Sequence, residues 1–557
     1  MTSFLKFAKL CKDVESVSGT LEKIDLVAGF LAELDESELY VAPGFIMGTV
    51  FSSGSDLVMG VGPSILYEAL ARACGCPPEQ ISSMLRATGD PGLVAAGVVQ
   101  RRKPLGLASF IGGEQLSISE VYQRFLAVAH ASGKRSHDTK IKNLQFLFSQ
   151  ASPLEAQYIA RLAIEDMRIG VGEGGVRDAI SKAFGMSAED VERAYNLTND
   201  MGLVAVSAKR GTLSELNVIL NHPIKMMLAQ LGEGIPAALQ ELGTAAIEWK
   251  YDGARVQIHK DGQKVRIFSR RLENVTASLP EIVSAVKANI RAKSAILDGE
   301  AVAIGQDERP MAFQEILKRF RRKYNVEKLA VQIPLRLFLF DLIYLDGKSI
   351  IDRPLRDRRA LLETIADPSM LAKQVLSNSS EVAEEIYRQA LDAGHEGLML
   401  KNPSSVYAPG KRGKNWLKIK PVMETLDLVV IGAKWGEGRR ASLLGSYRLG
   451  CLEPETGMLL DVGWVATGLT DEALSDLTEV FKGLIVVERG MELELKPAVI
   501  FEVAYEEIQK SPNYSSGYAL RFPRLVAVRD DKSIEEADTI ERVIALYKAQ
   551  RGRNTAS

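Results

Sequence analysis

The residues best suited to covalent chemistry lie in one octapeptide, EWKYDGAR, at residues 248–255. A lysine amine attacks only when unprotonated, so a nucleophilic lysine needs burial, nearby cations or a metal ion to lower its pKa from about 10.4. In extended chain, Lys250 would share a face with Glu248 and Asp252, and Gly253 would let backbone or ligand approach closely. Taken alone, this lysine is more often an ordinary salt-bridged strand residue than a nucleophile. Motifs elsewhere in the chain are therefore needed to distinguish the two.

The elements around this lysine are predicted to be strands. Residues 247–259 and 264–268 alternate as strands do, and Asp261-Gly262 joins them. That dipeptide favours tight hairpins, in which both turn residues need positive φ. The lysine is therefore expected just before a hairpin.

Polar residues recur in later predicted strands. Residues 296–304 contain Glu300 within Asp-Gly-Glu, for which an exposed turn is the default interpretation. Residues 335–344, LRLFLFDLIY, place Phe340 beside the polar Asp341. Aromatic residues in such a strand usually belong to the core.

Two further runs carry charge near residue 400. Residues 395–401, HEGLMLK, predict a strand. In residues 411–420, KRGKNWLKIK, alternation places Lys418 and Lys420 on one face and apolar side chains on the other. Such a strand buries one side and offers two ammonium groups on the other.

These blocks together resemble a known family. K-x-D-G, here Lys250 to Gly253, is the nucleotidyl-lysine motif of DNA ligases, RNA ligases and mRNA capping enzymes. With the later blocks in the same order, the chain resembles the archaeal and eukaryotic-type ATP-dependent DNA ligases. The resemblance implies that Lys250 takes AMP from ATP, that AMP passes to the 5′-phosphate of a DNA nick, and that the 3′-hydroxyl then displaces AMP.

The resemblance also implies the roles of the other site residues. Glu248 would accept a hydrogen bond from the adenine amino group, which discriminates against guanine, and Phe340 would stack on adenine. Glu300 would bind ribose hydroxyls and help to hold metal, and Glu396 would position Mg²⁺, with Mn²⁺ an alternative. The residues implied to contact ribose or phosphates are Arg255, Arg270, Arg412, Lys418 and Lys420. ADP and NAD stay open as additional adenylate donors.

Three domains are expected from the pattern and the resemblance. Residues 1–215 are Leu/Ala-rich and predict an all-α DNA-binding domain. Residues 216–422, a range that Pro421 closes, predict an α+β nucleotidyltransferase domain that is ATP-grasp-like. Residues 423–557 predict an all-β OB-fold domain with short strands and Gly-rich turns. WGEGRR (435–440), GSYRLG (445–450) and the charged segment 521–532 resemble parts of that barrel, and the last would contact pyrophosphate.

Several features of the helical region have both a functional and a purely structural interpretation. Ser152 to Glu155 predicts a capping box that opens a helix reaching to about Gly170, with Arg161 and Arg168 on its outer face. Gly170 to Gly175 follows a helix, which argues against a dinucleotide fingerprint and favours a glycine-rich elbow that could grip a phosphate. Gln100 to Phe110 could be a sliding-clamp loop, although a solvated loop is preferred.

Composition limits the alternatives. With 557 residues the chain should hold three or four domains, and its net charge of −2 means that DNA binding must come from local basic patches. One such candidate is KRFRRK (318–323), although a solvated helical face is the default for that run. The four cysteines match neither a disulfide framework nor zinc-ligand spacing. The N-terminus lacks an apolar signal core, which predicts a cytoplasmic protein, here expected to be a monomer.

Two rival functions fit part of the sequence. The first is an RNA-directed nucleotidyltransferase, either an RNA ligase or a GTP-using capping enzyme; the long helical N-terminal region and Glu248 argue against it. The second is a non-catalytic DNA-binding scaffold, which would have no need for intact Lys250, Glu300 and Glu396. Both rivals can be tested by label transfer from ATP and GTP.

Overall fold

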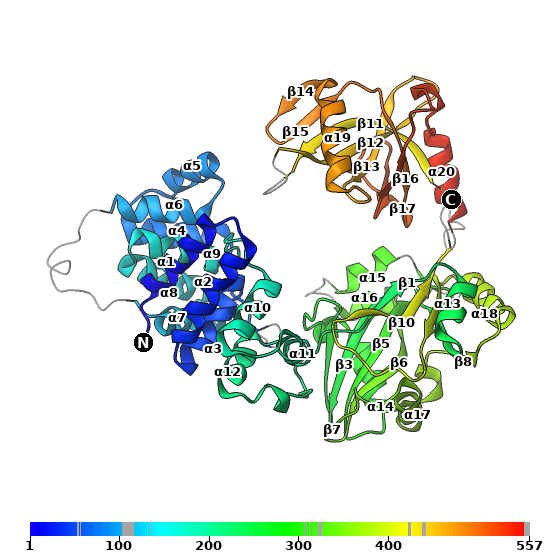
Figure 1. Cartoon of the computed structure of the whole chain (residues 1–557), viewed down its shortest axis with the longest axis horizontal. Coiled ribbons are helices and arrows are strands. Elements are labelled where there is room, and N and C mark those ends of the chain that lie inside the picture. Colours follow the sequence, from blue (N-terminus) through cyan, green and yellow to red (C-terminus); the bar gives the residue numbers. More distant parts are fainter. Residues whose placement is uncertain are drawn as a thin grey trace.

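The structure is a computed structural model, and it describes residues 1–52, 55, 57–102, 116–133, 135–305, 308–311, 313–320, 326–421, 425–436 and 442–550. Figure 1 shows a helical N-terminal part, a mixed α/β central part and a C-terminal β part. Each part has apolar clusters of its own. No helix in these ranges has the length and apolar character that crossing a bilayer requires.

The N-terminal part is built of helices around one apolar core. In its first helix, buried residues recur at helical spacing, from Phe4 and Phe7 to Cys11 and Val14. The elements are α1 (Phe4–Ser16), α2 (Thr20–Glu33), α3 (Glu36–Met47), α4 (Pro63–Cys74), α5 (Pro78–Thr88), α6 (Pro91–Gln100), α7 (Ile118–His130), α8 (Ser136–Gln150), α9 (Pro153–Ala163), α10 (Glu173–Phe184), α11 (Ala188–Thr198), α12 (Met201–Arg210) and η2 (Leu213–Glu215).

The capping box that opens α9 is confirmed: the Ser152 hydroxyl accepts from the Glu155 amide, and the Glu155 carboxylate accepts from the Ser152 amide. The prediction for the end of α9 is wrong, because the helix stops at Ala163 and a loop leads to α10. Arg168 is exposed as predicted, but it lies in that loop.

The prediction of an outer position for Arg161 is also wrong. Its side chain is buried against α6, where it donates to Asp90 at 2.6 Å, and it pairs with Glu15. Gly92 makes the space: a Cβ there would lie 2.8 Å from Arg161. A buried guanidinium needs such partners, and two carboxylates supply them.

The central part contains two sheets. One has the order β1-β10-β9-β2-β8 and the other the order β4-β3-β5-β6-β7. Their elements, with the intervening helices, are β1 (Leu228–Leu231), α13 (Ile235–Leu242), β2 (Ala245–Lys250), β3 (Ala254–Asp261), β4 (Lys264–Ser269), η3 (Thr276–Ser278), α14 (Pro280–Asn289), β5 (Ser294–Ala303), α15 (Phe313–Phe320), α16 (Val326–Gln332), β6 (Leu335–Leu345), β7 (Lys348–Ser349), α17 (Leu355–Ile365), η4 (Pro368–Met370), β8 (Gln374–Ser377), α18 (Ser380–Asp392), β9 (Gly397–Lys401) and β10 (Arg412–Ile419).

The sequence predicts one strand over residues 247–259, and this prediction is wrong. The run breaks after Lys250, and β2 and β3 belong to different sheets. Gly253 lies at the break, where an added Cβ would meet the Ala301 carbonyl oxygen of β5 at 2.6 Å. The hairpin between β3 and β4 is present, but Asp261 pairs with Lys264, so only Gly262 of the predicted dipeptide adopts a positive φ, +56°.

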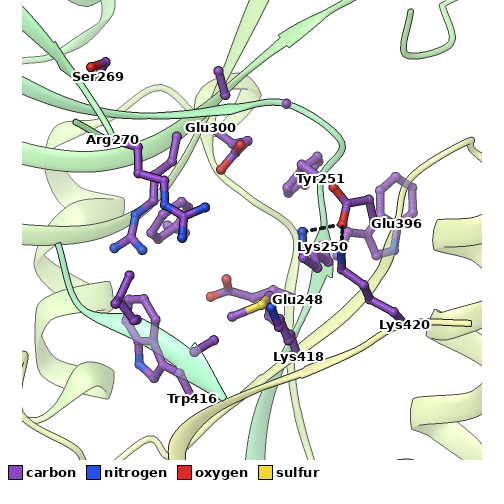
Figure 2. A pocket seen from close by; sticks show the side chains of 18 of the residues that line it. Glu248, Lys250, Tyr251, Ser269, Arg270, Glu300, Glu396, Trp416, Lys418 and Lys420 are labelled. Atoms are coloured by element: carbon purple, nitrogen blue, oxygen red, sulfur yellow. Dashed lines mark ion pairs between the residues drawn. The ribbon is translucent and has the colours of Figure 1, made fainter. Parts of the chain in front are cut away.

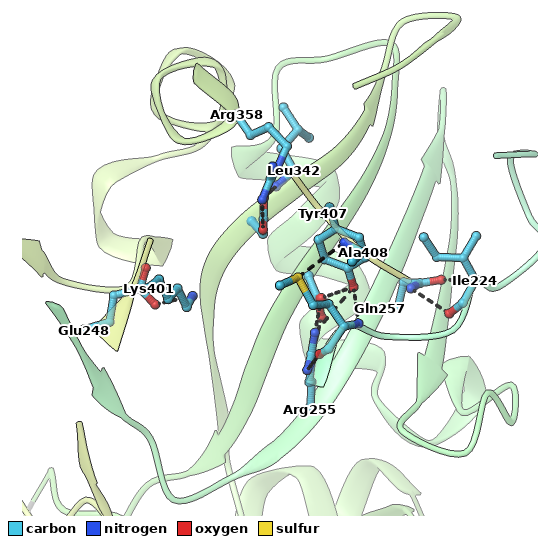
Figure 3. A network of polar contacts seen from close by, with 12 residues as sticks. Ile224, Glu248, Arg255, Gln257, Leu342, Arg358, Lys401, Tyr407 and Ala408 are labelled. Atoms are coloured by element: carbon cyan, nitrogen blue, oxygen red, sulfur yellow. Dashed lines mark hydrogen bonds and ion pairs between the residues drawn. The ribbon is translucent and has the colours of Figure 1, made fainter. Parts of the chain in front are cut away.

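The segment between the helices and the central part is fixed along β3 (Figure 3). Side chains of alternate β3 residues, all on one face of the strand, form hydrogen bonds with the backbone of this connecting segment. Arg255 donates to the Met227 carbonyl at 2.6 Å, and Gln257 exchanges hydrogen bonds with the amide and carbonyl of Ile224. His259 accepts from the Asn221 amide at 3.0 Å, and burial lowers the His259 pKa to about 3, which keeps the ring neutral. Leu197 of α11 joins an apolar cluster of the central part, so the two parts are packed together.

The C-terminal part is a sheet with the order β13-β12-β11-β15-β14, in which β16 pairs with β11 and β19, beside a separate β17–β18 pair. Its core gathers alternate residues of the strands, such as Leu426, Leu428 and Val430 of β11, together with residues of α19 and α20. The elements are β11 (Leu426–Trp435), β12 (Leu444–Leu452), β13 (Leu459–Val465), α19 (Asp471–Lys482), β14 (Ile485–Arg489), β15 (Glu492–Leu495), β16 (Ile500–Ala504), β17 (Glu507–Lys510), β18 (Tyr518–Arg521), β19 (Arg524–Val528), η6 (Ile534–Glu536) and α20 (Ile540–Ala549).

Candidate active site

A cleft of about 640 Å³ brings together residues from both central sheets. The site residues predicted from the sequence all line it, and Figure 2 shows several of them pointing into it. They are Glu248, Lys250, Arg255, Arg270, Glu300, Phe340, Glu396, Arg412, Lys418 and Lys420. Residues that are up to 172 positions apart, from Glu248 to Lys420, therefore share one site.

The amine of Lys250 is held by a carboxylate. Its Nζ lies 2.6 Å from Oε2 of Glu396, and the same oxygen lies 2.8 Å from Nζ of Lys420 (Figure 2). The Glu396 amide also donates to the Lys250 carbonyl at 2.9 Å. Burial works to raise the pKa of Glu396, but the ammonium groups of Lys250 and Lys420 outweigh it and lower the pKa to about 2. Glu396 is thus a charged group that orients two cations.

Deeper in the cleft, Glu248 is buried and accepts one hydrogen bond on each oxygen. Gln374 Nε2 donates to Oε1 at 2.7 Å, and Lys401 Nζ donates to Oε2 at 2.6 Å. The Lys401 ammonium also lies 4.4 Å from the ring centroids of Phe340 and Trp416. A buried carboxylate, a buried ammonium and two aromatic rings form this end of the cleft.

Phe340 reaches the cleft because of a bulge in β6. The register with β5 pairs Asp298 with Asp341 and then Gly299 with Leu339, which leaves Phe340 without a partner. A bulge of this kind re-aims a side chain. Its neighbour Asp341 is fully buried, and Arg358 donates to each of its two carboxylate oxygens at 2.8 Å.

Arg255 lines the cleft and also holds the structure around it. Its guanidinium donates to both oxygens of Asp298, at 3.0 and 2.5 Å, and to the Met227 carbonyl. Tyr407 donates to Asp298 at 2.8 Å. The implied contact of Arg255 with the nucleotide would therefore come from a side chain that is already fixed by several bonds.

Two carboxyl groups close to Lys250 have raised pKa values. Burial raises the pKa of Glu300 to about 8, although Lys250 and Arg255 oppose the rise. Burial and the charge of Glu396 raise the pKa of Asp252 to about 7. Asp252 does not share a strand face with Lys250 as expected, because β2 has ended and the residue lies in the turn before β3.

The phosphate-binding candidates sit on β10 and just after it. Leu417 and Ile419 are buried, whereas Lys418 and Lys420 face the cleft, which confirms the predicted alternation. Burial, followed by the charges of Lys420 and Lys250, lowers the pKa of Lys418. Arg270 follows β4 and reaches the cleft from the other sheet.

The C-terminal part contributes to the lining of the cleft. Glu506, Arg521 and Phe522 line it, and Glu506 lies 3.4 Å from Lys420. Arg529 and Lys532, from the same predicted motif as Arg521, bond Asp427 instead.

The sequence matches three family profiles, described as "DNA ligase N terminus" at residues 3–181, "ATP dependent DNA ligase domain" at 226–420 and "ATP dependent DNA ligase C terminal region" at 440–532. It is 64% identical to a DNA ligase of Methanothrix thermoacetophila over 100% of both chains. It is 50% identical to a DNA ligase of Archaeoglobus fulgidus over 98% of this chain and 99% of that protein. The chain belongs to the ATP-dependent DNA ligase family. Its fold is also similar to the solved structure "Pmar-Lig_PreS3", with a TM-score of 0.52, 17% identity and coverage of 94% of this chain and 99% of that one.

In this ligase, several cleft residues were not predicted from the sequence. Gln374 and Lys401 lie on β8 and β9, which pair with β2 although they are distant from it in the chain. Trp416 lies on β10, and Tyr407 lies in the loop before that strand. Gln374 and Tyr407 bond Glu248 and Asp298 behind the lining of the cleft. Lys401 ends HEGLMLK two residues beyond Met399, so the two residues share a strand face, and that spacing is the one signal that could have found Lys401.

Some sequence predictions lie outside the described residues of the ligase. These are most of the possible clamp loop (103–110), the end of WGEGRR (437–440) and Arg321 to Lys323 of KRFRRK. The expected solvated face of KRFRRK is wrong at Arg319, which is buried and donates to the carbonyls of Ile333 and Ser278. The glycine-rich elbow does follow a helix, and α10 begins at Glu173 within it.

Proposed function

We propose that this chain seals nicks in duplex DNA through a covalent AMP adduct on Lys250. The observation that carries the proposal is the shared cleft. A lysine amine lies with a buried carboxylate and an aromatic ring suited to a base, and with two further lysines suited to phosphates. Nucleotide transfer needs these three functions in one place.

In the first step, the unprotonated Nζ of Lys250 attacks the α-phosphorus of ATP. An N–P bond forms, the bond to the bridging oxygen of the β-phosphate breaks, and pyrophosphate leaves with that electron pair. Glu248 accepts a hydrogen bond from the 6-amino group of adenine, and it rejects guanine because a 6-oxo group cannot donate. Phe340 stacks on the base.

The remaining residues bind ribose and phosphates. Glu300 binds the ribose hydroxyls, and Arg255, Arg270 and Arg412 hold the ribose and the phosphate chain from both sheets. Lys418 and Lys420 neutralise charge on the phosphates as it develops. Arg521, which lines the cleft from the C-terminal part, would contact the pyrophosphate.

Glu396 and Glu300 fit a divalent cation, with Mg²⁺ the first choice and Mn²⁺ the second. Within the described residues no cluster of three or more metal-binding side chains exists. That agrees with Mg²⁺ at nucleotide sites, which takes one or two carboxylates and completes its coordination with phosphate oxygens and water. When bound, the ion would neutralise phosphate charge.

In the second step, an oxygen of the 5′-phosphate at a nick attacks the adenylate phosphorus, and the N–P bond to Lys250 breaks. In the third, the 3′-hydroxyl attacks the activated 5′-phosphorus and AMP leaves. We assign the chain three domains: a DNA-binding domain at 1–215, an ATP-grasp-like nucleotidyltransferase domain at 216–422 and an OB-fold domain at 423–557. The first and last would grip the duplex through phosphates, with salt-sensitive and largely sequence-independent binding.

Mass spectrometry of the purified chain tests the proposal. After incubation with ATP and Mg²⁺, an AMP adduct should appear on Lys250 and disappear when nicked DNA is added and sealed. The Lys250→Ala variant should form no adduct. An adduct that only RNA discharges would favour the RNA-directed rival, and no adduct with ATP, GTP, ADP or NAD would favour a scaffold.

A further inference from the structure

Lys401 is a buried charge that the reaction outlined above does not use. It is 1% exposed, and its chain neighbour on the opposite face, Leu400, packs in the core. β9 pairs with β2 so that Glu248 lies opposite Met399, and Lys401 is therefore the diagonal neighbour of Glu248 on the same face. Burying an ammonium is costly unless it is paired, and here its ion-pair partner is Glu248 (Figure 3).

The hydrogen bonds to Glu248 leave some acceptor positions of its carboxylate free. An ionised carboxylate has about four acceptor positions and no donor. Gln374 occupies a position on one oxygen and Lys401 a position on the other. The remaining acceptor positions suit an amino group and repel a carbonyl oxygen.

The other contacts of Lys401 fix where this acceptor sits. Its ammonium lies 4.4 Å from the Phe340 ring, which we assign to base stacking, and 4.4 Å from the ring of Trp416, its cross-strand partner on β10. The same ammonium therefore contacts the stacking ring and the hydrogen-bonding carboxylate. We infer that Lys401 is a positioning residue for base selection: it holds the Glu248 carboxylate as a charged acceptor, aligned with Phe340, for the 6-amino group of the nucleotide. This inference rests on the proposed function and deepens it.

Removing the Lys401 charge should therefore change selectivity more than general activity. Without the ammonium, the buried carboxylate would take up a proton or turn toward Gln374, and a protonated carboxyl offers a donor where the 6-amino group also donates. Binding of a nucleotide that lacks the 6-amino group would be affected much less.

The test compares two donors in single-turnover self-adenylation of the full chain: ATP and purine ribonucleoside triphosphate, which lacks the 6-amino group. The readout is the ratio of kcat/KM values, measured by mass spectrometry of the lysine adduct. Lys401→Gln, which keeps most of the side-chain volume, and Lys401→Met should each lower the preference for ATP by about tenfold, the effect of losing one aligned polar contact. Lys401→Arg, which keeps the charge, should retain most of the preference.

A double-variant comparison separates positioning from a structural role. Glu248→Gln alone should remove the preference, and adding Lys401→Gln should lower it no further, because Lys401 acts through Glu248. An equal loss of activity with both donors, an unchanged ratio, or failure of both neutral Lys401 variants to fold would overturn the inference and make Lys401 a structural residue. If the wild-type chain forms no adduct with ATP, the proposed function itself fails, whereas an adduct formed without preference for ATP overturns only base selection.

Discussion

Nζ of Lys250 and Oε2 of Glu396 lie 2.6 Å apart, at the ends of two antiparallel strands that are joined by the Glu396 amide. The strand pairing thus places the carboxylate beside the amine without help from a ligand. Lys420 bonds the same oxygen from β10's end. The nucleophile Lys250 and the candidate phosphate ligand Lys420 are therefore held by one carboxylate, that of the candidate metal ligand Glu396.

We expect Glu396→Gln to lower the rate of self-adenylation with ATP by on the order of 100-fold, because the neutral amide neither attracts a divalent cation nor fixes the two ammonium groups. The half-saturating Mg²⁺ concentration should rise as well. Rapid-quench measurement of adduct formation over a Mg²⁺ series checks both effects. Glu385→Gln, on the exposed side of α18, is the control. A Glu396→Gln chain with normal rate and normal Mg²⁺ dependence would contradict the link.

We expect Gly253→Ala to lose both stability and adenylation. The added Cβ would meet the Ala301 carbonyl oxygen at 2.6 Å and the Glu300 side chain at 2.8 Å, so β5 must move away from the turn that follows Lys250. Overpacking of this kind costs roughly 1–3 kcal/mol in the free energy of unfolding. Gly413→Ala, on β10, is the matched control, since nothing lies within 4 Å of its added Cβ. Urea unfolding and adduct formation should separate the two variants. Equal stability and equal adduct formation would show that the contact between Gly253 and β5 has room for a methyl group.

The sequence predicted the members of the site better than their surroundings. Short motifs identify Lys250, Glu300 and Lys418, because their chemistry depends on residue type and on alternation that is local in the chain. The capping box at Ser152 was predictable for the same reason. Both are properties of a few consecutive residues.

Features that depend on contacts across the chain were missed. The burial of Arg161 requires the space that Gly92 leaves on another helix. The break after Lys250 follows from β2 and β3 joining different sheets, and the bulge at Phe340 follows from a register shift with β5. Nothing in a single run of sequence specifies strand partners, so these features had no local signal.

We expect the buried pair of Asp341 and Arg358 to be strongly asymmetric in its response to substitution. Both side chains are 0% exposed, so Asp341→Ala should cost about 3–5 kcal/mol by leaving the guanidinium without its carboxylate. The double variant Asp341→Leu, Arg358→Met should recover much of that loss, although the Arg353 and Ser405 carbonyls would lose a donor. Urea titration with hydrogen exchange at β5 and β6 amides reports on this part of the chain. A double variant as unstable as the single one would show that packing, not the unpaired charge, sets the cost.

We expect Glu300 to make stability of the ligand-free chain fall with rising pH. Its pKa is raised from 4.5 to about 8 on folding, chiefly by burial. Between these values the folded state keeps a proton that the unfolded state has lost, so the free energy of unfolding declines as pH rises through the window. Glu300→Gln removes this titration, and its stability relative to the wild type should rise by about 4 kcal/mol between pH 5 and pH 8.5. Thermal unfolding at half-unit pH steps, without nucleotide or divalent metal, measures the difference, with exposed Glu384→Gln as control. A difference that does not change with pH would mean that the Glu300 carboxyl is already ionised in the folded cleft.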